Sequence, residues 1–209
     1  IFDGELPNIP KGERIVVHIG SHQNCSDELT EAIDAFCEEY NAVVCCDHTS
    51  GYRGRFEVHS QLVCCQKQWH STLADAHLCI HIGEVSGDLF FIRAEHTWRV
   101  SPDGALRDTF GTLRRVFMMP ELAFFRHYIK KQGKHTEYLR ELKEEIEKVK
   151  KQLPELPFSN IWIAQNMVDK LPENCELHFG IYQRLRSWNF FPLPPKVLAK
   201  CNVGGFGID

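Results

Sequence analysis

The stretch Arg14-Ile-Val-Val-His-Ile-Gly20 is followed later in the chain by His77-Leu-Cys-Ile-His-Ile-Gly83, which has the same His-Ile-Gly ending. A third apolar run, Ala42-Val-Val-Cys-Cys46, lies between them. Each run is short, almost continuously apolar and bounded by turn residues, which is typical of strands buried on both faces. Between the runs at 14–20 and 42–46, apolar residues recur at the spacing of a helix. This alternation predicts an α/β protein with a parallel sheet and helices on both of its faces.

The same alternation continues through the rest of the chain. Ser26 is suited to capping the helix that follows the first strand, because its hydroxyl can accept a bond from a free backbone amide. Pro120 fits the first position of a later helix. Further strands are expected at 96–100 and 115–119 and from Cys175 onward, and further helices at 58–66, 86–93, 120–131 and 159–171.

Residues 135–153 differ from their surroundings, because one apolar stripe at helical spacing runs through many Glu and Lys residues. This pattern predicts an amphipathic surface helix, which Pro154 and Pro157 end. We interpret the charged residues as a solvated face. The alternative, a coiled-coil partner, would require three or more full heptads.

The composition limits the possible classes of protein. The chain has 209 residues, 43% of them hydrophobic, and a net charge of -4, which suits one large domain or one domain with an extension. No apolar run reaches membrane-spanning length, and the mild acidity gives no reason to expect a nucleic-acid partner. The chain begins with Ile1 and no signal-peptide pattern precedes the first strand, so we expect a piece cut from a longer cytoplasmic protein.

The nine cysteines are an odd number, and most lie inside apolar runs. Buried free thiols in a reducing compartment are the simplest interpretation. A zinc site is one alternative for Cys45, Cys46 and His48, with Cys64 and Cys65. Neighbouring residues on a strand point to opposite faces, so Cys45 and Cys46 do not form a chelating pair. We therefore predict free thiols and no metal site.

In a parallel sheet, ligands bind outside the carboxyl ends of the strands. The loops expected there begin at Gly20-Ser21, Asp47 and Gly83, so Gly20, Ser21 and Gly83 are candidate cofactor-binding residues. None of these loops contains a G-x-G-x-x-G fingerprint or a phosphate-binding P-loop, so a dinucleotide site is only weakly indicated. The pairs Arg53/Arg55 and Arg184/Arg186 could hold carboxylates or could be solvated surface.

The last part of the chain carries the most site-like pattern. A short apolar run that starts at Cys175 ends in Gly180-Ile-Tyr-Gln-Arg184-Leu-Arg186, and a second run leads into Asn202-Val-Gly-Gly-Phe-Gly-Ile-Asp209. Glycines at a strand end, here including Gly204 and Gly205, let a ligand approach the backbone closely. A chain that stops directly after such a loop looks cut rather than finished.

This stretch resembles the joint between the central and pyrophosphate-binding domains of thiamine-diphosphate enzymes. The greatest similarity is to the menaquinone-pathway synthases that join 2-oxoglutarate to isochorismate. In that family a strand ends in Gly-Asn-Ser, a helix with an arginine follows, and a second strand leads into Asn-Arg-Gly-Ala-Ser-Gly-Ile-Asp-Gly. Arg186 lies where the family has its helix arginine. Val203 stands where the family has a substrate-binding arginine, and the serine of Gly-Asn-Ser is not preserved.

The resemblance implies a Rossmann-like central domain at 1–172 and the start of a truncated pyrophosphate-binding domain at 173–209. It implies a parent that decarboxylates a 2-oxo acid and ligates the product with thiamine diphosphate and Mg²⁺. The parent's pyrimidine-binding and pyrophosphate-binding domains would complete a homodimer or homotetramer. Arg184, Arg186 and Asn202 would bind substrate, whereas this chain alone would hold no catalytic residue and no cofactor.

Two other functions stay open at this point. The chain could be a Rossmann-like module that binds FAD or ADP, as some relatives of the central domain do, or a non-catalytic scaffold. The apolar side chains of the last part, Leu185, Trp188, Phe190 and Phe191, should be ordered in either case, because burying large apolar side chains is favourable by about 1.5–3 kcal/mol each. They would pack back on the larger domain or pair two copies of the chain, and we slightly favour self-association.

Overall fold

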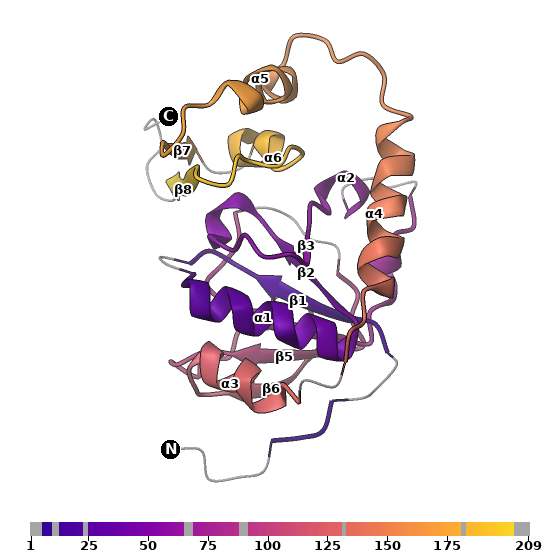
Figure 1. Ribbon diagram of the computed structural model, residues 1–209, viewed down its shortest axis with the longest axis vertical. Coiled ribbons are helices and arrows are strands. Elements are labelled where there is room, and N and C mark those ends of the chain that lie inside the picture. The colour runs from indigo at the N-terminus through magenta and orange to yellow at the C-terminus, as the bar shows by residue number, and fades with distance from the viewer. Residues whose placement is uncertain are drawn as a thin grey trace.

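The computed structural model describes residues 6–9, 13–22, 25–64, 69–87, 92–130, 133–180 and 183–202. Its centre is a six-stranded sheet in which every strand pairs in parallel with its neighbours, in the order β3-β2-β1-β4-β5-β6 (Figure 1). This is the strand order of a Rossmann-like fold, so the predicted fold class is confirmed. The strands are β1 (Ile15–Ile19), β2 (Ala42–Cys46), β3 (Glu57–Val58), β4 (Leu78–Ile82), β5 (His96–Val100) and β6 (Leu113–Phe117).

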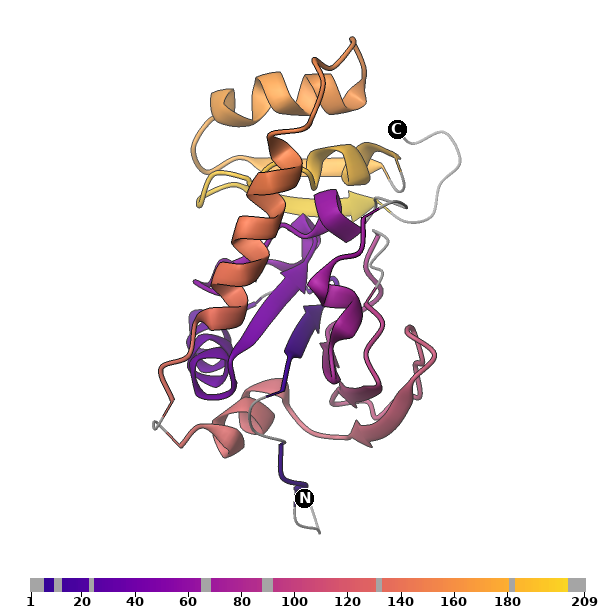
Figure 2. The same ribbon diagram turned by 90° about the vertical axis from the view of Figure 1, so that its right-hand side faces the viewer.

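Helices cover both faces of this sheet (Figures 1 and 2). On one face, α1 (Asp27–Tyr40) and α3 (Glu121–Tyr128) pack against each other and against the sheet through side chains such as Phe36, Phe124 and Phe125. On the other face lie α4 (Glu137–Lys150) and the single turn of α2 (Gln61–Cys64). Burial on both faces explains why β1, β2 and β4 are continuously apolar or nearly so.

The ends of α1 follow from its sequence. The Ser26 hydroxyl accepts a hydrogen bond from Leu29 N at 3.2 Å, and Asn41 ends the helix in the left-handed conformation with φ of 52°.

The predicted amphipathic helix is α4, which is shorter than expected at both ends. Its apolar stripe is buried against the sheet, and four of its residues are Tyr138, Leu142, Ile146 and Val149.

A second, two-stranded parallel sheet follows, made of β7 (Glu176–Gly180) and β8 (Leu198–Asn202). The linker from α4 leads to α5 (Asn160–Met167) and the short 3-10 helix η3 (Val168–Lys170), and α6 (Gln183–Trp188) joins the two strands. This part lies beyond one end of the six-stranded sheet (Figure 2). The two remaining 3-10 helices are η1 (His48–Ser50) and η2 (Thr72–Asp75).

The structure corrects several predicted boundaries. Residues 57–58 form the edge strand β3, where a helix was expected from 58, and α2 begins only at Gln61. The strand predicted at 115–119 lies at 113–117, so Met118 is exposed instead. Pro120 precedes α3 instead of starting it, and α3 ends at Tyr128. Of the helix predicted at 86–93, the described residues are not helical, and 88–91 lie outside the described part.

Two further predictions concern cysteines and membranes. The eight cysteines in the described ranges are free, and Cys45 and Cys46 belong to clusters on opposite faces of the sheet, as predicted for neighbours on a strand. Cys65 lies outside the described residues. Within the described ranges, the helices are too short or too polar to cross a membrane.

Candidate functional site

The loops that follow β1 and β4 meet at the carboxyl end of the six-stranded sheet, where the strand order changes direction. Gly20 N donates to Ile82 O at 3.0 Å, and Glu84 N donates to Ser21 O at 2.8 Å. A Cβ atom on Gly20 would lie 1.7 Å from Glu84 O. The two loops are therefore in close contact at the crevice in which a Rossmann-like fold binds its ligand.

Side chains close this crevice further. His22 Nε2 lies 2.8 Å from Glu121 Oε2, and Glu121 Oε1 accepts a bond from Gly83 N at 2.9 Å. Burial lowers the pKa of His22, but the hydrogen bond and the negative charge of Glu121 outweigh burial, so the pKa is raised. Through these contacts Glu121 joins the β1 and β4 loops to the start of α3.

A buried carboxylate organises the neighbouring loop after β2. Asp47 Oδ1 accepts from Thr49 N at 2.7 Å and from Thr49 Oγ1 at 2.5 Å, and Asp47 Oδ2 accepts from Ser86 Oγ and from Gly87 N. The hydroxyl of Ser21 in turn contacts Thr49 Oγ1 at 2.5 Å. The candidate residue Ser21 is thus part of a network that joins three loops of the protein to one another.

Three polar side chains lie next to one another on β1, β4 and β5. Each belongs to the last residue but one of its strand. The register places His18 beside His81 and His81 beside Arg99. Phe110 packs edge-on against both imidazoles. Burial lowers the pKa of His18 to about 4, and burial with the charges of His18 and Arg99 lowers that of His81 to about 2. Both imidazoles are therefore neutral near pH 7 and serve as packing groups.

The second part of the chain is seated on this end of the sheet. His48 N donates to Asn189 Oδ1 at 3.2 Å, and His48 Nε2 lies 3.0 Å from Trp188 O, to which it donates when the proton is on that nitrogen. A Cβ on Gly87 would lie 2.6 Å from Leu185 Cδ2, so Gly87 lets α6 approach. The last part of the chain thus packs on the carboxyl end of the larger sheet, which is one of the two arrangements considered above, and the slightly favoured self-association stays a prediction.

The predicted substrate-binding residues lie elsewhere, around the two-stranded sheet. Arg184 and Arg186 belong to α6, where Arg184 is exposed and Arg186 is half-buried. Asn202 ends β8, and the register places it beside Gly180 at the end of β7. Asn202 therefore lies at the carboxyl end of the parallel pair, Arg184 and Arg186 lie in the helix that follows β7, and the roles of all three stay predictions. Gly204 and Gly205 lie outside the described residues, as does Val203.

The other arginine pair has local partners. Arg55 Nε lies 3.1 Å from Asp34 Oδ2, and Arg55 NH1 lies 2.8 Å from Glu38 Oε1, both on α1. Arg53 NH1 donates to the carbonyl of Tyr52 at 2.7 Å. Arg55 thus holds carboxylates, as the sequence allowed, but they are those of the protein's own helix.

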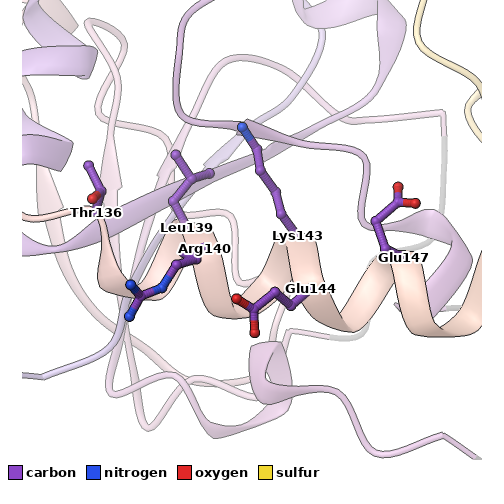
Figure 3. A pocket seen from close by; sticks show the side chains of 6 residues that line it. All are labelled: Thr136, Leu139, Arg140, Lys143, Glu144 and Glu147. Carbon is purple, nitrogen blue, oxygen red and sulfur yellow. The ribbon is translucent and has the colours of Figure 1, made fainter.

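Two surface hollows were not indicated by the sequence. One is a cavity of about 600 Å³ between the end of α4, α5 and the loop after α6, lined by mostly apolar residues such as Leu153, Ile161, Phe190 and Phe191. The other is a shallow groove along the outer side of α4, where Figure 3 shows Lys143, Glu144 and Glu147 at its surface. Neither gathers groups with an evident chemistry.

One group of side chains in the described ranges could ligate a metal, namely His77, Glu95 and His96. It combines two imidazoles with one carboxylate, whereas Mg²⁺ prefers oxygen ligands. It also lies at the amino ends of β4 and β5, away from the loops described above. The ligand types of this group therefore do not match those that Mg²⁺ prefers.

The fold and these loops define a Rossmann-like α/β domain with a smaller parallel unit seated on its carboxyl end. Searches with protein-family models found no match. The chain is similar to the 2-succinyl-5-enolpyruvyl-6-hydroxy-3-cyclohexene-1-carboxylate synthases of Bacteroides fragilis (32% identical over 117 residues), Phocaeicola vulgatus (30% over 116) and Flavobacterium johnsoniae (27% over 119). These matches cover 54–55% of this chain and 20–21% of the relatives. The chain is thus related to these synthases, and the matched region spans about a fifth of their length.

Proposed function

We propose that this chain is the central domain, followed by the opening strands of the pyrophosphate-binding domain, of a thiamine-diphosphate-dependent enzyme related to the menaquinone-pathway synthases. The observation that carries the proposal is the similarity to those synthases, at 32% identity over 117 residues. The arrangement of β7, α6 and β8 supports it, because Gly180 and Asn202 meet at the carboxyl end of a parallel pair, with α6 starting three residues after β7.

In this proposal the six-stranded part is a scaffold. Its carboxyl end is occupied by hydrogen-bonded loops and by α6, which supports a structural role over the binding of FAD or ADP. We place thiamine diphosphate and its Mg²⁺ in the parent's other two domains. The parent would be a cytoplasmic homodimer or homotetramer that decarboxylates a 2-oxo acid and ligates the product to an acceptor.

Arg186 and Arg184 are the residues of this chain that we expect to contact substrate in the parent. A guanidinium presents a planar set of donors that matches a carboxylate, and the synthase substrates that the resemblance implies are carboxylic acids. Their position on α6, beside the strand end that carries Asn202, would place a substrate carboxylate next to the domain boundary.

The test has two arms. The 209-residue chain with thiamine diphosphate, Mg²⁺ and 2-oxoglutarate should release no carbon dioxide above background. The protein translated from the longer coding sequence should release it. The resemblance implies that this sequence continues soon after Asp209 into the Gly-Asp-Gly pattern with which the family's third domain holds magnesium and the diphosphate. In that protein Arg186→Gln should lower kcat/KM by about tenfold or more, in line with the loss of a charge-assisted bond, which is worth roughly 1.5–3 kcal/mol. Arg184→Gln, on the same helix, tells which arginine carries the contact.

Cofactor-dependent turnover by the chain alone would refute the proposal, as would a stop codon directly after Asp209. Thermal unfolding with FAD, ADP or NAD tests the nucleotide-binding alternative. A ligand at a hundred times its dissociation constant adds about 2.7 kcal/mol to the free energy of unfolding, so binding would raise Tm visibly. We expect no shift, and a shift with FAD or ADP would replace the scaffold role by nucleotide binding.

A further inference from the structure

Four side chains with metal-binding groups gather at the amino-terminal edge of the six-stranded sheet. His77 directly precedes β4, Glu95 directly precedes β5, and His96 is the first residue of β5. One ligand atom from each of these three lies within 4.8 Å of the others. Glu13, which precedes β1, is next to them, with its Oε2 atom 2.6 Å from His77 Nδ1.

The sheet holds the three segments that carry these side chains. His77 N donates to Arg14 O at 2.9 Å, His96 N donates to His77 O at 3.0 Å, and Glu95 N donates to Ala76 O at 3.1 Å. The backbone is therefore hydrogen-bonded at His77, Glu95 and His96, and Glu13 directly precedes Arg14, whose carbonyl accepts one of these bonds. A site built on strand ends is held more rigidly than one built on a loop.

Two carboxylates at this edge share one imidazole nitrogen. Glu13 Oε2 and Glu95 Oε2 lie 2.6 Å and 3.2 Å from the same nitrogen, His77 Nδ1, which carries at most one proton to share between them. The imidazole of His96 lies edge to face with that of His77, at 5.4 Å between ring centroids. His96 Nδ1 is buried and has no hydrogen-bond partner among the described residues. A divalent cation would neutralise both carboxylates and would give the imidazoles a common partner.

We propose that His77, Glu95 and His96 bind a Zn²⁺ ion, with Glu13 as the fourth ligand. Two imidazoles and two carboxylates match the tetrahedral nitrogen and oxygen shell that zinc accepts, whereas Mg²⁺ and Ca²⁺ prefer oxygen alone. Four protein ligands leave no open position for substrate, so the site is structural. The ion would tie the segment before β1 to the starts of β4 and β5. This site differs from the prediction of no metal site, which rested on the cysteine-rich segments, because His77 and Glu95-His96 meet only when β4 pairs with β5.

The experiment measures metal binding by the metal-free 209-residue chain. Isothermal titration with Zn²⁺ should show a single equivalent bound and a raised Tm, and titration with Mg²⁺ or Ca²⁺ should show neither. Co²⁺ reports the ligands directly, because a thiolate shell gives a strong sulfur-to-cobalt charge-transfer band and a nitrogen and oxygen shell does not. We expect the visible bands of tetrahedral Co²⁺ without that charge-transfer band.

Glu95→Gln is the decisive variant, because the side chain is 69% exposed and the change is isosteric, so folding should be unaffected. Glu95→Gln and Glu13→Gln should each weaken Zn²⁺ binding by at least about tenfold, the lower end of what the loss of an outer-shell partner costs. The matched control is Glu176→Gln, which removes a carboxylate 2.9 Å from another histidine, His178, and should leave affinity unchanged. The proposal is overturned by wild-type affinity in Glu95→Gln, by a sulfur charge-transfer band, or by the absence of a bound equivalent.

Discussion

The two parallel sheets of this chain differ sharply in how they are buried. Every residue of β1, β2 and β4 is buried, and helices cover both faces of their sheet. In β7 only the last two residues are buried, and Leu198 in β8 is 57% exposed. Parallel strands are normally covered on both faces, and two strands alone are marginal in water. The comparison shows that a parallel pair depends on its neighbours and is not a unit that is stable by itself.

The small sheet compensates with two sets of contacts. Its own apolar cluster has Val168, Leu193 and Val197 at the centre, with Trp188 and Phe191 packed around them. Its second support is the six-stranded part, through β8 and η1 and through the hydrogen bonds of His48. We therefore expect the small sheet to unfold before the large one, and the following predictions test this difference.

Acidification should have the largest effect, because buried neutral histidines support both parts. Burial lowers the folded-state pKa of His18 to about 4 in the large sheet and that of His48 to about 4 at the junction, against an ordinary value of 6.5. The unfolded chain therefore takes up protons first, so stability is fully present above pH 6.5 and is lost as the pH falls toward 4. Urea unfolding between pH 7.5 and 4.5 measures the slope.

Single histidine variants show which part of the chain causes the loss of stability at low pH. His48→Gln should reduce the acid sensitivity of the junction, measured by the protection of β8 from hydrogen exchange, because an amide carries no titrating proton. His178→Gln replaces an exposed histidine of β7 and should leave the slope unchanged. Stability that does not fall between pH 6.5 and 4 would contradict the burial of these imidazoles.

The next largest effect is expected from a pair of truncations. Phe36 is fully buried between α1 and the sheet and contacts the rings of Tyr40 and Phe125. Phe36→Ala should lower the free energy of unfolding by about 3–5 kcal/mol, because it removes a large apolar side chain and leaves a cavity. Leu198→Ala in β8 should change it by less than about 0.5 kcal/mol, since the side chain is exposed. Equal losses in the two variants, measured by urea unfolding, would contradict the comparison.

The smallest effect is expected from two matched helix caps. Ser26 caps α1, and Ser159 caps α5 by accepting from Trp162 N at 3.2 Å. Replacing either by Ala should cost about 1 kcal/mol. Ser26→Ala should lower global stability, because α1 is part of the main core. Ser159→Ala should speed hydrogen exchange only in α5, where Ala164 is the buried residue. A global loss in both would mean that the two parts unfold as one.

The sequence predicted the elements that are decided by local patterns. The strands β1, β2 and β4 were located within one residue, because double-sided burial makes them apolar runs of the right length. The two-residue strand β3 was missed, since it is too short to show a period. The strand β6 was placed two residues late, because Met118 extends an apolar run although it is 71% exposed.

Contacts between distant segments could not be predicted in this way. The bond from His48 to Asn189 joins residues 141 positions apart, and no local signal marks either partner. The His77, Glu95 and His96 group depends on the pairing of β4 with β5, so only the dipeptide Glu95-His96 was visible in the sequence. The roles of Arg184, Arg186 and Asn202 stay predictions that rest on resemblance.

The close meeting of the β1 and β4 loops limits which sequences can carry this fold. In a library that samples every amino acid at each glycine, position 20 should return glycine alone, because the Glu84 carbonyl is backbone and cannot rotate away. Position 87 should accept alanine, because it is the tip of the flexible Leu185 side chain that would have to move. Substitutions would thus be tolerated at position 87, where the two parts of the chain meet through a flexible side chain. They would be rejected at position 20, where two backbone segments of the large domain meet.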